Sequence, residues 1–382
     1  MKNELEVHFV SKDHVYQKLI DKFPNKKNQI HNILMPTPID GKYGPSVFLS
    51  LLNFLVPIEQ NPSLVNQIID YLREERKLYN KEKFDLVIND GDMGSNILAK
   101  NRNIPSLFIT NQFRPKLYKS RSYFYPSLYF ISKQIGKAKE ILVADSPPPY
   151  TLCEYNLNFT KEIEKKVTYV GHFTSKKIVQ NNSSSDFEKL IEGYDFGYWM
   201  RTGNKSTNDG TGERYEHVFH QDEMKTERRI ISHAKNDSSI DSVLDKNGKK
   251  FSVSEALEKK IDWVQIDIGF LSDQEKEKVL NLCKYAVVNG SHTVMGEILG
   301  GNSKPIIGIP VYDEHENNIK WAEENNLGIC AKKTHHVLKG IKTIKENYNK
   351  FEESLQDFAK NFVFNGAENT AKIAGQILEE KR

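Results

Sequence analysis

The sequence predicts an α/β protein built from two similar halves, and three observations support this. Short apolar runs alternate with helix-like segments, which is the pattern of a parallel sheet with covering helices. The alternation pauses at an Asn- and Ser-rich stretch, which is typical of a linker, and then resumes. The chain has 382 residues, 38% of them hydrophobic, which exceeds what one core comfortably supports. We therefore predict an N-terminal domain at 1–173, a linker at 174–188, a C-terminal domain at 189–365, and a final helix at 366–382 that packs back on the first domain.

In the first half, apolar runs that end in polar turns predict the strands. Amphipathic spacing predicts helices at 45–56 and 66–78, and a small-residue turn, GDMGSN, leads into another helix. Three consecutive prolines at 147–149 exclude regular structure. The predicted strands are 6–10, 84–90, 104–110, 139–144 and 167–173.

The second half repeats this order of elements. Its closing segment, 341–382, is predicted to be mostly helical, with a break at Asn365-Gly366. The predicted strands are 196–200, 229–232, 263–266, 285–288 and 305–309, and the predicted helices are 252–260, 272–283 and 293–300. Ligands of parallel sheets bind beyond the carboxyl ends of the strands, so the turns after the strands are the places to look for function.

Composition excludes several classes of function. No apolar run reaches the ~18 residues that a transmembrane helix needs, and residues 1–10 lack the pattern of a signal peptide, so we expect a cytoplasmic protein. Cys153, Cys283 and Cys330 follow no metal-ligand spacing. We expect neither a metal nor a cofactor. The net charge of +3 is too small to indicate nucleic-acid binding.

Positive charge is concentrated in residues 113–139, which contain no Asp or Glu. Aromatic residues alternate with the basic ones, a combination that favours contact with anionic lipid, although a core helix with solvated lysines is the alternative. The basic residues are Arg114, Lys116, Lys119, Arg121, Lys133, Lys137 and Lys139, and the aromatic residues are Phe113, Tyr118, Tyr123, Phe124, Tyr125, Tyr129 and Phe130.

Residues 286–318 give the sharpest functional signal. A predicted strand ends at Asn289, Gly290 permits a tight turn, and Ser291, His292 and Thr293 open a helix. The first amides of a helix are unpaired and its dipole is positive there, so this turn suits a diphosphate. A capped strand–helix unit with a surface histidine is the alternative.

Polar residues continue this pattern downstream. Glu297 lies four residues after Thr293, one helical turn on, where its carboxylate can bind both hydroxyls of a ribose. The next predicted strand ends in a loop at the same sheet edge, and its carboxylate, imidazole and amide groups suit sugar hydroxyls. These loop residues are Asp313, Glu314, His315, Asn317 and Asn318.

The segment resembles the C-terminal signature of GT-B glycosyltransferases related to family 28, the group that includes MurG and the Alg13/Alg14 pair. The resemblance is specific over about 263–330. It implies two Rossmann-like domains with a donor cleft between them and a nucleotide-sugar donor. It also implies Gly290, Ser291, His292 and Thr293 at the diphosphate, Glu297 at the ribose, and Glu314, His315 and Asn318 at the sugar.

Two further turns fit the resemblance. The Gly-rich segment YWMRTGNKSTNDGTGERY follows the strand at 196–200, and the resemblance implies that Gly203, Ser206 and Thr207 close over phosphates there. A simply mobile loop is the alternative. The segment VQIDIGFLSDQ implies Phe270 at the base, and UDP is the nucleotide that the resemblance suggests.

Asp90 and Asp92 follow the strand at 84–90 and are the candidate catalytic residues. A D-x-D motif binds metal–diphosphate in GT-A enzymes, but the donor signature lies in the other half. We expect one of them to orient an acceptor hydroxyl or to act as general base. A solvated acidic turn is the alternative.

Members of the resembled family begin with a strand and a Gly-rich turn that often supplies the catalytic base. Residues 6–10 resemble their second strand, so we expect about 25 to 30 residues of a first βα unit to be missing. The resemblance therefore implies that the usual base lies upstream of Met1, which is the alternative to Asp90 and Asp92.

The sequence as a whole predicts an inverting glycosyltransferase of the hexosyltransferase type. Its acceptor is expected to be a glycan or a lipid-linked molecule, and peripheral membrane contact is expected through 113–139. The alternatives are a nucleotide-sugar 2-epimerase and a catalytically impaired binding protein that docks a partner.

Overall fold

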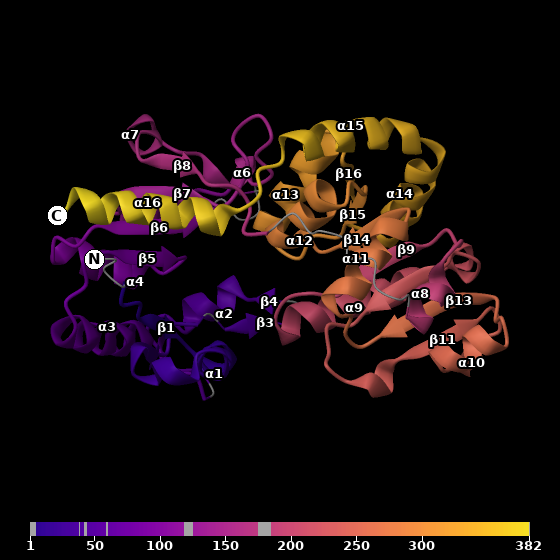
Figure 1. The fold of residues 1–382 in the computed structure, drawn as a ribbon, viewed down its shortest axis with the longest axis horizontal. Helices are drawn as coiled ribbons and strands as arrows, with labels where there is room; N and C mark the ends of the chain where they lie inside the picture. The colour runs from indigo at the N-terminus through magenta and orange to yellow at the C-terminus, as the bar shows by residue number, and fades with distance from the viewer. Residues whose placement is uncertain are drawn as a thin grey trace.

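The computed structural model describes residues 5–37, 39–41, 44–58, 60–117, 125–174 and 185–381. Its elements are arranged around two main sheets that lie side by side, one of four parallel strands and one of eight mostly parallel strands (Figure 1). This confirms the predicted α/β class. The first half contains β1 (Phe9–Ser11), α1 (Asp13–Lys22), β2 (Ile30–Asn32), β3 (Asp40–Gly41), β4 (Gly44–Pro45), α2 (Val47–Leu52), α3 (Leu64–Lys81), β5 (Val87–Asp90), α4 (Met93–Asn101), β6 (Ser106–Thr110), α5 (Tyr125–Ile135), β7 (Glu140–Val143), α6 (Glu154–Leu157), α7 (Lys161–Glu164) and β8 (Val167–Tyr169).

The second half follows residues 175–184, which make up most of the predicted linker and lie outside the described residues. It contains α8 (Asp186–Ile191), β9 (Gly197–Met200), α9 (Lys205–Phe219), β10 (Arg229–Ser232), β11 (Ser242–Asp245), β12 (Lys250–Phe251), α10 (Val253–Glu258), β13 (Trp263–Ile268), α11 (Asp273–Leu282), β14 (Tyr285–Val288), α12 (His292–Gly296), β15 (Ile306–Gly308), α13 (Asp313–Glu324), β16 (Gly328–Cys330), α14 (Thr334–Glu346), α15 (Tyr348–Asn361) and α16 (Gly366–Glu380).

The second sheet is the larger one. Its strands run in the order β12-β11-β13-β10-β9-β14-β15-β16. The pairs from β13 to β16 are parallel, whereas β11 pairs antiparallel with both β12 and β13. Trp199, Trp263 and Tyr285 are fully buried in its core. The sequence analysis missed the β11–β12 hairpin, although Asn247-Gly248 between the two strands is a turn signal.

The first half contains four paired parallel strands in the order β5-β6-β7-β8 and a separate parallel pair, β1 and β2. Among the described strands, none pairs with both β1 and β5, so the two groups of strands are not joined into one sheet. Met1 lies outside the described residues. The expectation that a first strand is missing before Met1 stays a prediction.

Several predicted boundaries were wrong. The strand predicted at 6–10 is Phe9–Ser11, and the helix predicted at 45–56 is only Val47–Leu52. The strand predicted at 167–173 ends at Tyr169, which leaves His172 in the turn that follows. A run of apolar residues cannot show where pairing stops. Val170 and Gly171 still donate to Val143 and Asp145, whereas the His172 amide donates to Val363 of the other half at 2.9 Å.

The Gly-rich segment after β9 was also interpreted wrongly as one long loop. Residues 205–219 form α9, whose N-terminus is capped by the Asn204 side chain, a 3.0 Å acceptor for the Thr207 amide. Gly212 is inside this helix, and a Cβ there would lie 2.4 Å from Cζ of Arg201. The glycine is therefore present to let Arg201 pack against the helix and not to make a loop mobile.

Helix α16 leaves the second half and packs on the first sheet, where it lies along β6 and β7 (Figure 1). Ala374 and Ile377 contact a cluster that contains Leu107 of β6 and Leu142 of β7. Two ion pairs hold its C-terminal end in place. Lys139 Nζ lies 2.8 Å from Glu380 Oε2, and Lys381 Nζ lies 3.1 Å from Asp85 Oδ1. Within the described part of the chain, no helix combines the length and apolarity needed to cross a bilayer.

Candidate active site

Three turns of the second sheet meet around one cavity of about 240 Å³, which we call the helix-end cavity. They follow β9, β14 and β15, which are parallel neighbours, so their carboxyl ends lie at one edge of the sheet. Each turn leads into a helix: α9, α12 or α13. The lining residues are Thr202, Gly203, Asn204, Thr207, Asn289, Ser291, Tyr312 and His315.

The three helix starts differ in how they are capped. Asn204 caps α9, but Ser291 before α12 and Tyr312 before α13 make no side-chain cap bond. Uncapped amides at a helix start attract an anion, and the helix dipoles add to this attraction. The cavity is therefore suited to a diphosphate group, as the sequence predicts.

Gly290 is what allows β14 and α13 to approach each other. Its φ is +96°, a left-handed conformation that favours glycine. A Cβ at this position would lie 2.7 Å from the backbone oxygen of His315 and 2.8 Å from Cδ1 of Ile319. The glycine thus fixes the distance between two of the helix starts.

His315 is 96% buried against this cavity, since only 4% of its surface is exposed. Its Nδ1 is buried without a hydrogen-bond partner. Burial lowers the pKa of His315 to about 4, so the imidazole is neutral at pH 7. A neutral ring with an unused nitrogen can bind a hydroxyl group of a ligand in the cavity.

A second cavity of about 270 Å³ lies between the two halves, and we call it the bridging cavity. The first half contributes residues at the carboxyl ends of its strands, and the second half contributes the start of α12. The lining residues are Asp90, Gly91, Ile109, Thr110, Asn111, Gln112, Ala144, His172, Phe173, Thr174, His292 and Thr293. The predicted diphosphate residues are therefore divided, because Ser291 lines the helix-end cavity and His292 and Thr293 line the bridging cavity.

Asp145, directly after β7, is the centre of a buried cluster beside the bridging cavity. It has no exposed surface, and it accepts hydrogen bonds at 2.7 and 2.8 Å from the amides of Ser146 and Cys153. His292 Nε2 lies 3.0 Å from its Oδ2, and His172 Nε2 lies 2.9 Å from its Oδ1. Burial alone would raise the pKa of Asp145, but the two histidines hold it well below its usual range. The carboxylate is therefore ionised, and His292 Nε2–H donates to it.

The two imidazole rings are stacked. Their centroids are 5.0 Å apart, and the ring of Phe362 covers the other face of His172 at 4.1 Å. Burial lowers the pKa of His172, while Asp145 opposes this effect. The ring stack therefore joins the turn after β8, the start of α12 and the segment before α16.

Asp145, Cys153 and His292 have ligand atoms within 4.8 Å of one another, close enough for a metal ion. Metal binding needs a thiolate, but burial and the neighbouring Asp145 raise the pKa of the Cys153 thiol well above its usual value. Oδ2 of Asp145 is also bonded already to Cys153 N and His292 Nε2. These residues fit a hydrogen-bonded cluster better than a metal site.

Amide side chains join the two halves beside this cluster. Asn156 of α6 donates to Asn318 Oδ1 at 2.8 Å and accepts from Asn317 at the same distance. Asn318 Nδ2 in turn donates to the Gly290 carbonyl at 3.0 Å, and the residue has no exposed surface. The predicted contact of Asn318 with a sugar stays a prediction, since both ends of its amide have protein partners. Glu314, predicted to bind the same sugar, accepts from Asn111 at 3.1 Å, and burial raises its pKa.

Phe270 and Glu297 lie apart from both cavities. Phe270 follows β13 and exposes 64% of its surface, as a platform for a nucleobase would. Glu297 follows α12 directly, and its side chain is 17% exposed and paired with Lys276 of α11 at 2.9 Å. A ribose would thus meet an ion pair and not an isolated carboxylate.

The two candidate catalytic carboxylates are in different surroundings. Asp90 lines the bridging cavity. Asp92 does not, because it caps α4 through the amides of Gly94 and Ser95 and accepts a hydrogen bond from Tyr71. The Asp92 carboxylate is thus held by partners within the first half, and its catalytic role stays a prediction.

The structure does not test the alternative position for the base, which is upstream of Met1. Met1 and the next three residues lie outside the described residues, and the described chain starts at Leu5. A base before Met1 stays a prediction. The described residues already bring other groups that can accept a proton, Asp90 and His292, to the bridging cavity.

Two residues of the predicted phosphate loop line the helix-end cavity, and a third does not. Gly203 and Thr207 are among its lining residues. Ser206 instead donates to Asn204 Oδ1 at 3.1 Å. The hydroxyl of Ser206 therefore supports the cap of α9.

Sequence analysis missed Asp145, His172 and Asn156 as candidate site residues. Asp145 and His172 both follow strands, so the rule that selected Asp90 applies to them too. His172 was hidden in a strand predicted too long, and Asp145 lies just before the prolines. Asn156 has no sequence signal, because its partners are about 160 residues away.

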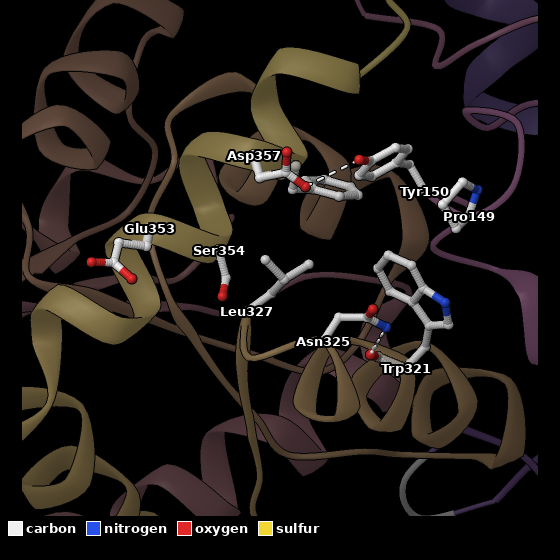
Figure 2. A pocket seen from close by; sticks show the side chains of 9 residues that line it. Pro149, Tyr150, Trp321, Asn325, Leu327, Glu353, Ser354 and Asp357 are labelled. Carbon is white, nitrogen blue, oxygen red and sulfur yellow. Dashed lines mark hydrogen bonds between the residues drawn. The ribbon is translucent and has the colours of Figure 1, made fainter.

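A third cavity of about 450 Å³ shares no lining residue with the other two. Figure 2 shows Trp321, Asn325 and Leu327 on one side of it and the α15 residues Glu353, Ser354 and Asp357 on another. Tyr150 donates to Asp357 at 3.1 Å across its edge. None of the site residues predicted from the sequence lines this cavity.

The overall fold aligns with those of solved glycosyltransferase structures. The structure of the glycotransferase of kitacinnamycin aligns over 97% of this chain and 91% of that chain, with a TM-score of 0.61 and 12% identity. This chain has the GT-B fold. A Phytolacca americana structure, UGT2 complexed with UDP-2-fluoro-glucose and pterostilbene, aligns over 97% and 91% of the two chains, with a TM-score of 0.58 and 12% identity.

Sequence comparison gives a more limited result. An uncharacterized glycosyltransferase from Methanosarcina mazei is 26% identical over 264 residues, which is 66% of this chain and 61% of that relative. The match thus spans about three fifths of the relative's length. No protein-family model matches the chain, and the resemblance to family 28 stays a prediction.

Proposed function

We propose that this protein is a glycosyltransferase that moves a sugar from a nucleotide-linked donor to an acceptor hydroxyl group. The observation on which this rests is the helix-end cavity, where the starts of α9, α12 and α13 surround a space of about 240 Å³. Ser291 of this cavity adjoins His292 of the bridging cavity, which both halves line, so a donor and an acceptor can bind in separate cavities. The GT-B fold and the similarity to the Methanosarcina mazei glycosyltransferase support the proposal.

Each part of the donor is assigned to the residues whose chemistry suits it. We propose the diphosphate against the amides after Gly290, with Ser291 and Thr207 beside it, and the base against Phe270. Glu297 is proposed for the ribose, and Glu314 and His315 for a hexose. The similarity to a structure solved with UDP-2-fluoro-glucose favours a UDP-linked donor.

The acceptor is proposed to carry a large apolar part. Phe48, Leu51, Leu52, Phe54, Leu55 and Val56 of α2 and the turn after it each expose 45–73% of their surface, a patch that soluble proteins reserve for binding. The patch lies near the donor side, because Asn204 at the start of α9 donates to Asp40 of β3 at 3.1 Å. A lipid-linked acceptor would occupy both this patch and the bridging cavity.

Membrane contact through α5 is a related proposal. Tyr125, Tyr129 and Phe130 expose 47–63% of their surface. Arg114 and Lys116 line a neighbouring cavity together with the first two of these rings. Exposed aromatic rings beside basic side chains favour the surface of an anionic membrane. Phe113, in contrast, is buried in the core, and Lys119 and Arg121 lie outside the described residues.

The proposed chemistry is a single displacement with inversion at the anomeric carbon. The acceptor hydroxyl in the bridging cavity attacks that carbon from the face opposite the diphosphate. The helix starts stabilise the charge that develops on the departing nucleoside diphosphate. The amides at these helix starts supply the positive potential for this role.

The test uses the full chain with a set of radiolabelled UDP- and TDP-sugars and, as acceptors, glycolipids and free glycans that carry unsubstituted hydroxyl groups. The expected result is nucleoside diphosphate released in step with labelled glycolipid or glycan. Release without acceptor, or conversion of the donor to its 2-epimer, would contradict the proposal and favour hydrolysis or epimerisation. Binding of donor with no chemistry under any condition would favour the binding-protein alternative.

A further inference from the structure

The cluster around Asp145 joins a residue of each half at the bridging cavity. His292 is the first residue of α12 in the second half, and Asp145 follows β7 in the first half. His292 Nε2 is 3.0 Å from Asp145 Oδ2, and both side chains are at least 95% buried. Because Asp145 is ionised, this bond fixes the tautomer of His292 with its proton on Nε2.

The other nitrogen of His292 is unoccupied. Among the described residues, Nδ1 has no hydrogen-bond partner, and the side chain lines the bridging cavity. In this tautomer Nδ1 has a lone pair and can accept a proton. The adjacent residue, Ser291, lines the helix-end cavity. The lone pair is thus placed within one residue of the position proposed for the donor.

From this geometry we infer that His292 is the general base of the transfer reaction and that Asp145 is its positioning residue. The inference deepens the proposed function and rests on it. The acceptor proton moves to His292 Nδ1 while the acceptor oxygen forms its bond to the anomeric carbon. The bond from that carbon to the diphosphate oxygen breaks, and the electron pair leaves with the nucleoside diphosphate. The ionised Asp145 stabilises the imidazolium until its proton passes to solvent.

Two other groups near the cavity are less suitable. Asp90 lines it, but no side-chain hydrogen bond within the described part of the chain orients its carboxylate. His172 also approaches Asp145, but its ring is held between the rings of Phe362 and His292, and a Cβ on Gly296 would lie 2.7 Å from its Nδ1. The ionisable groups that face His292 are Asp145, His172, the thiol of Cys153 and Glu314.

The assignment differs from the role that the sequence resemblance implies for His292. A diphosphate ligand would contribute to donor affinity, whereas a base contributes to turnover and leaves donor affinity unchanged. Loss of a diphosphate ligand should therefore weaken donor binding and raise Kd, whereas loss of the base should lower kcat and leave Kd unchanged. This difference makes the inference testable with one substitution.

The experiment compares His292→Gln, Asp145→Asn and His172→Gln in the full chain, with kcat and acceptor KM from initial rates and donor Kd from calorimetry with UDP. For His292→Gln we expect kcat to fall by about 10² to 10⁴ with Kd unchanged. For Asp145→Asn we expect a smaller fall in kcat and a changed acid limb in the pH profile of kcat/KM, which a merely structural contact would leave in place. For His172→Gln, whose ring stacks on His292 without receiving the proton, we expect a smaller fall in kcat than for His292→Gln.

Retained kcat with weakened UDP binding in His292→Gln would overturn the inference and return His292 to the diphosphate. A loss of turnover in His172→Gln without one in His292→Gln would overturn it in favour of His172. A wild-type chain that binds UDP but transfers no sugar would refute both the inference and the proposed function, whereas normal transfer by His292→Gln refutes the inference alone. If Asp145→Asn fails to bind UDP and is therefore misfolded, the His292→Gln result decides by itself.

Discussion

Replacing Gly290 with alanine tests how the turn after β14 positions the helix starts. The added Cβ would lie 2.7 Å from the His315 backbone oxygen and 2.8 Å from Ile319 Cδ1, with φ at +96°. A left-handed conformation costs a non-glycine residue about 1–2 kcal/mol. Overpacking a dense core costs about 1–3 kcal/mol more. We expect Gly290→Ala to lower the free energy of unfolding by about 2 to 5 kcal/mol, the sum of these two costs.

The assay is denaturant unfolding followed by tryptophan fluorescence. All three tryptophans are in the second half, at 199, 263 and 321, so the signal reports the half that contains Gly290. Calorimetry with UDP measures whether the displaced start of α13 also weakens nucleotide binding, as expected. Gly375→Ala is the matched control, because nothing lies within 4 Å of its Cβ and it is inside α16.

The control should gain about 0.5–1 kcal/mol from replacing glycine within a helix. If Gly290→Ala unfolds at the same denaturant concentration as wild type, the tight approach between the turn and α13 is not what the structure indicates. Equal losses in both variants would show that glycine content, and not this contact, determines the effect.

Three further predictions follow from single residues. Burial, with Asp92 adding to it, raises the pKa of Glu75 from 4.5 to about 8, so the folded protein holds a proton that the unfolded chain releases. The contribution of Glu75 to the free energy of unfolding is therefore fully present below pH 4.5 and falls by up to about 1.4 kcal/mol per pH unit until pH 8. Glu75→Gln should abolish this slope in unfolding curves measured from about pH 5 to 9. Glu297→Ala should weaken UDP binding by about 1.5 to 3 kcal/mol in calorimetry, whereas Glu380→Ala, which breaks a surface pair with Lys139, should not; unchanged affinity for every nucleotide that binds would exclude Glu297 from the site. Wild type should float with anionic vesicles at low salt and be released as salt screens the attraction, while the triple variant Lys116→Glu, Lys133→Glu and Lys137→Glu should not float; wild type that ignores such vesicles would refute the membrane contact.

The fold class followed from the sequence because strands and helices alternate with strong periodicity. The turn at Asn289-Gly290 was predicted for the same local reason, since a strand, a glycine and a helix start are adjacent in the chain. The structure places Ser291 and His315 at one cavity, which agrees with where the resemblance puts a donor, although their roles stay proposals.

The bridging cavity was not predictable in the same way. His292 meets Asp145 across 147 residues, and Asn317 meets Asn156 across 161. No periodicity within one segment encodes such pairs, because they depend on how the two halves approach. For this reason the sequence offered only Asp90, Asp92 or a position before Met1 for the base. Asp92 was selected by a local rule alone, and that rule could not show that Tyr71 and the α4 amides donate hydrogen bonds to its carboxylate.

The return of α16 to the first sheet has a consequence for biosynthesis. Leu107 and Leu142 are covered by residues that leave the ribosome more than 230 positions later. The first half therefore emerges with part of its apolar surface uncovered, and it cannot reach its final packing until α16 has been synthesised. Nascent chains that stall within the second half would expose this surface to chaperones, so maturation of the two halves should finish together.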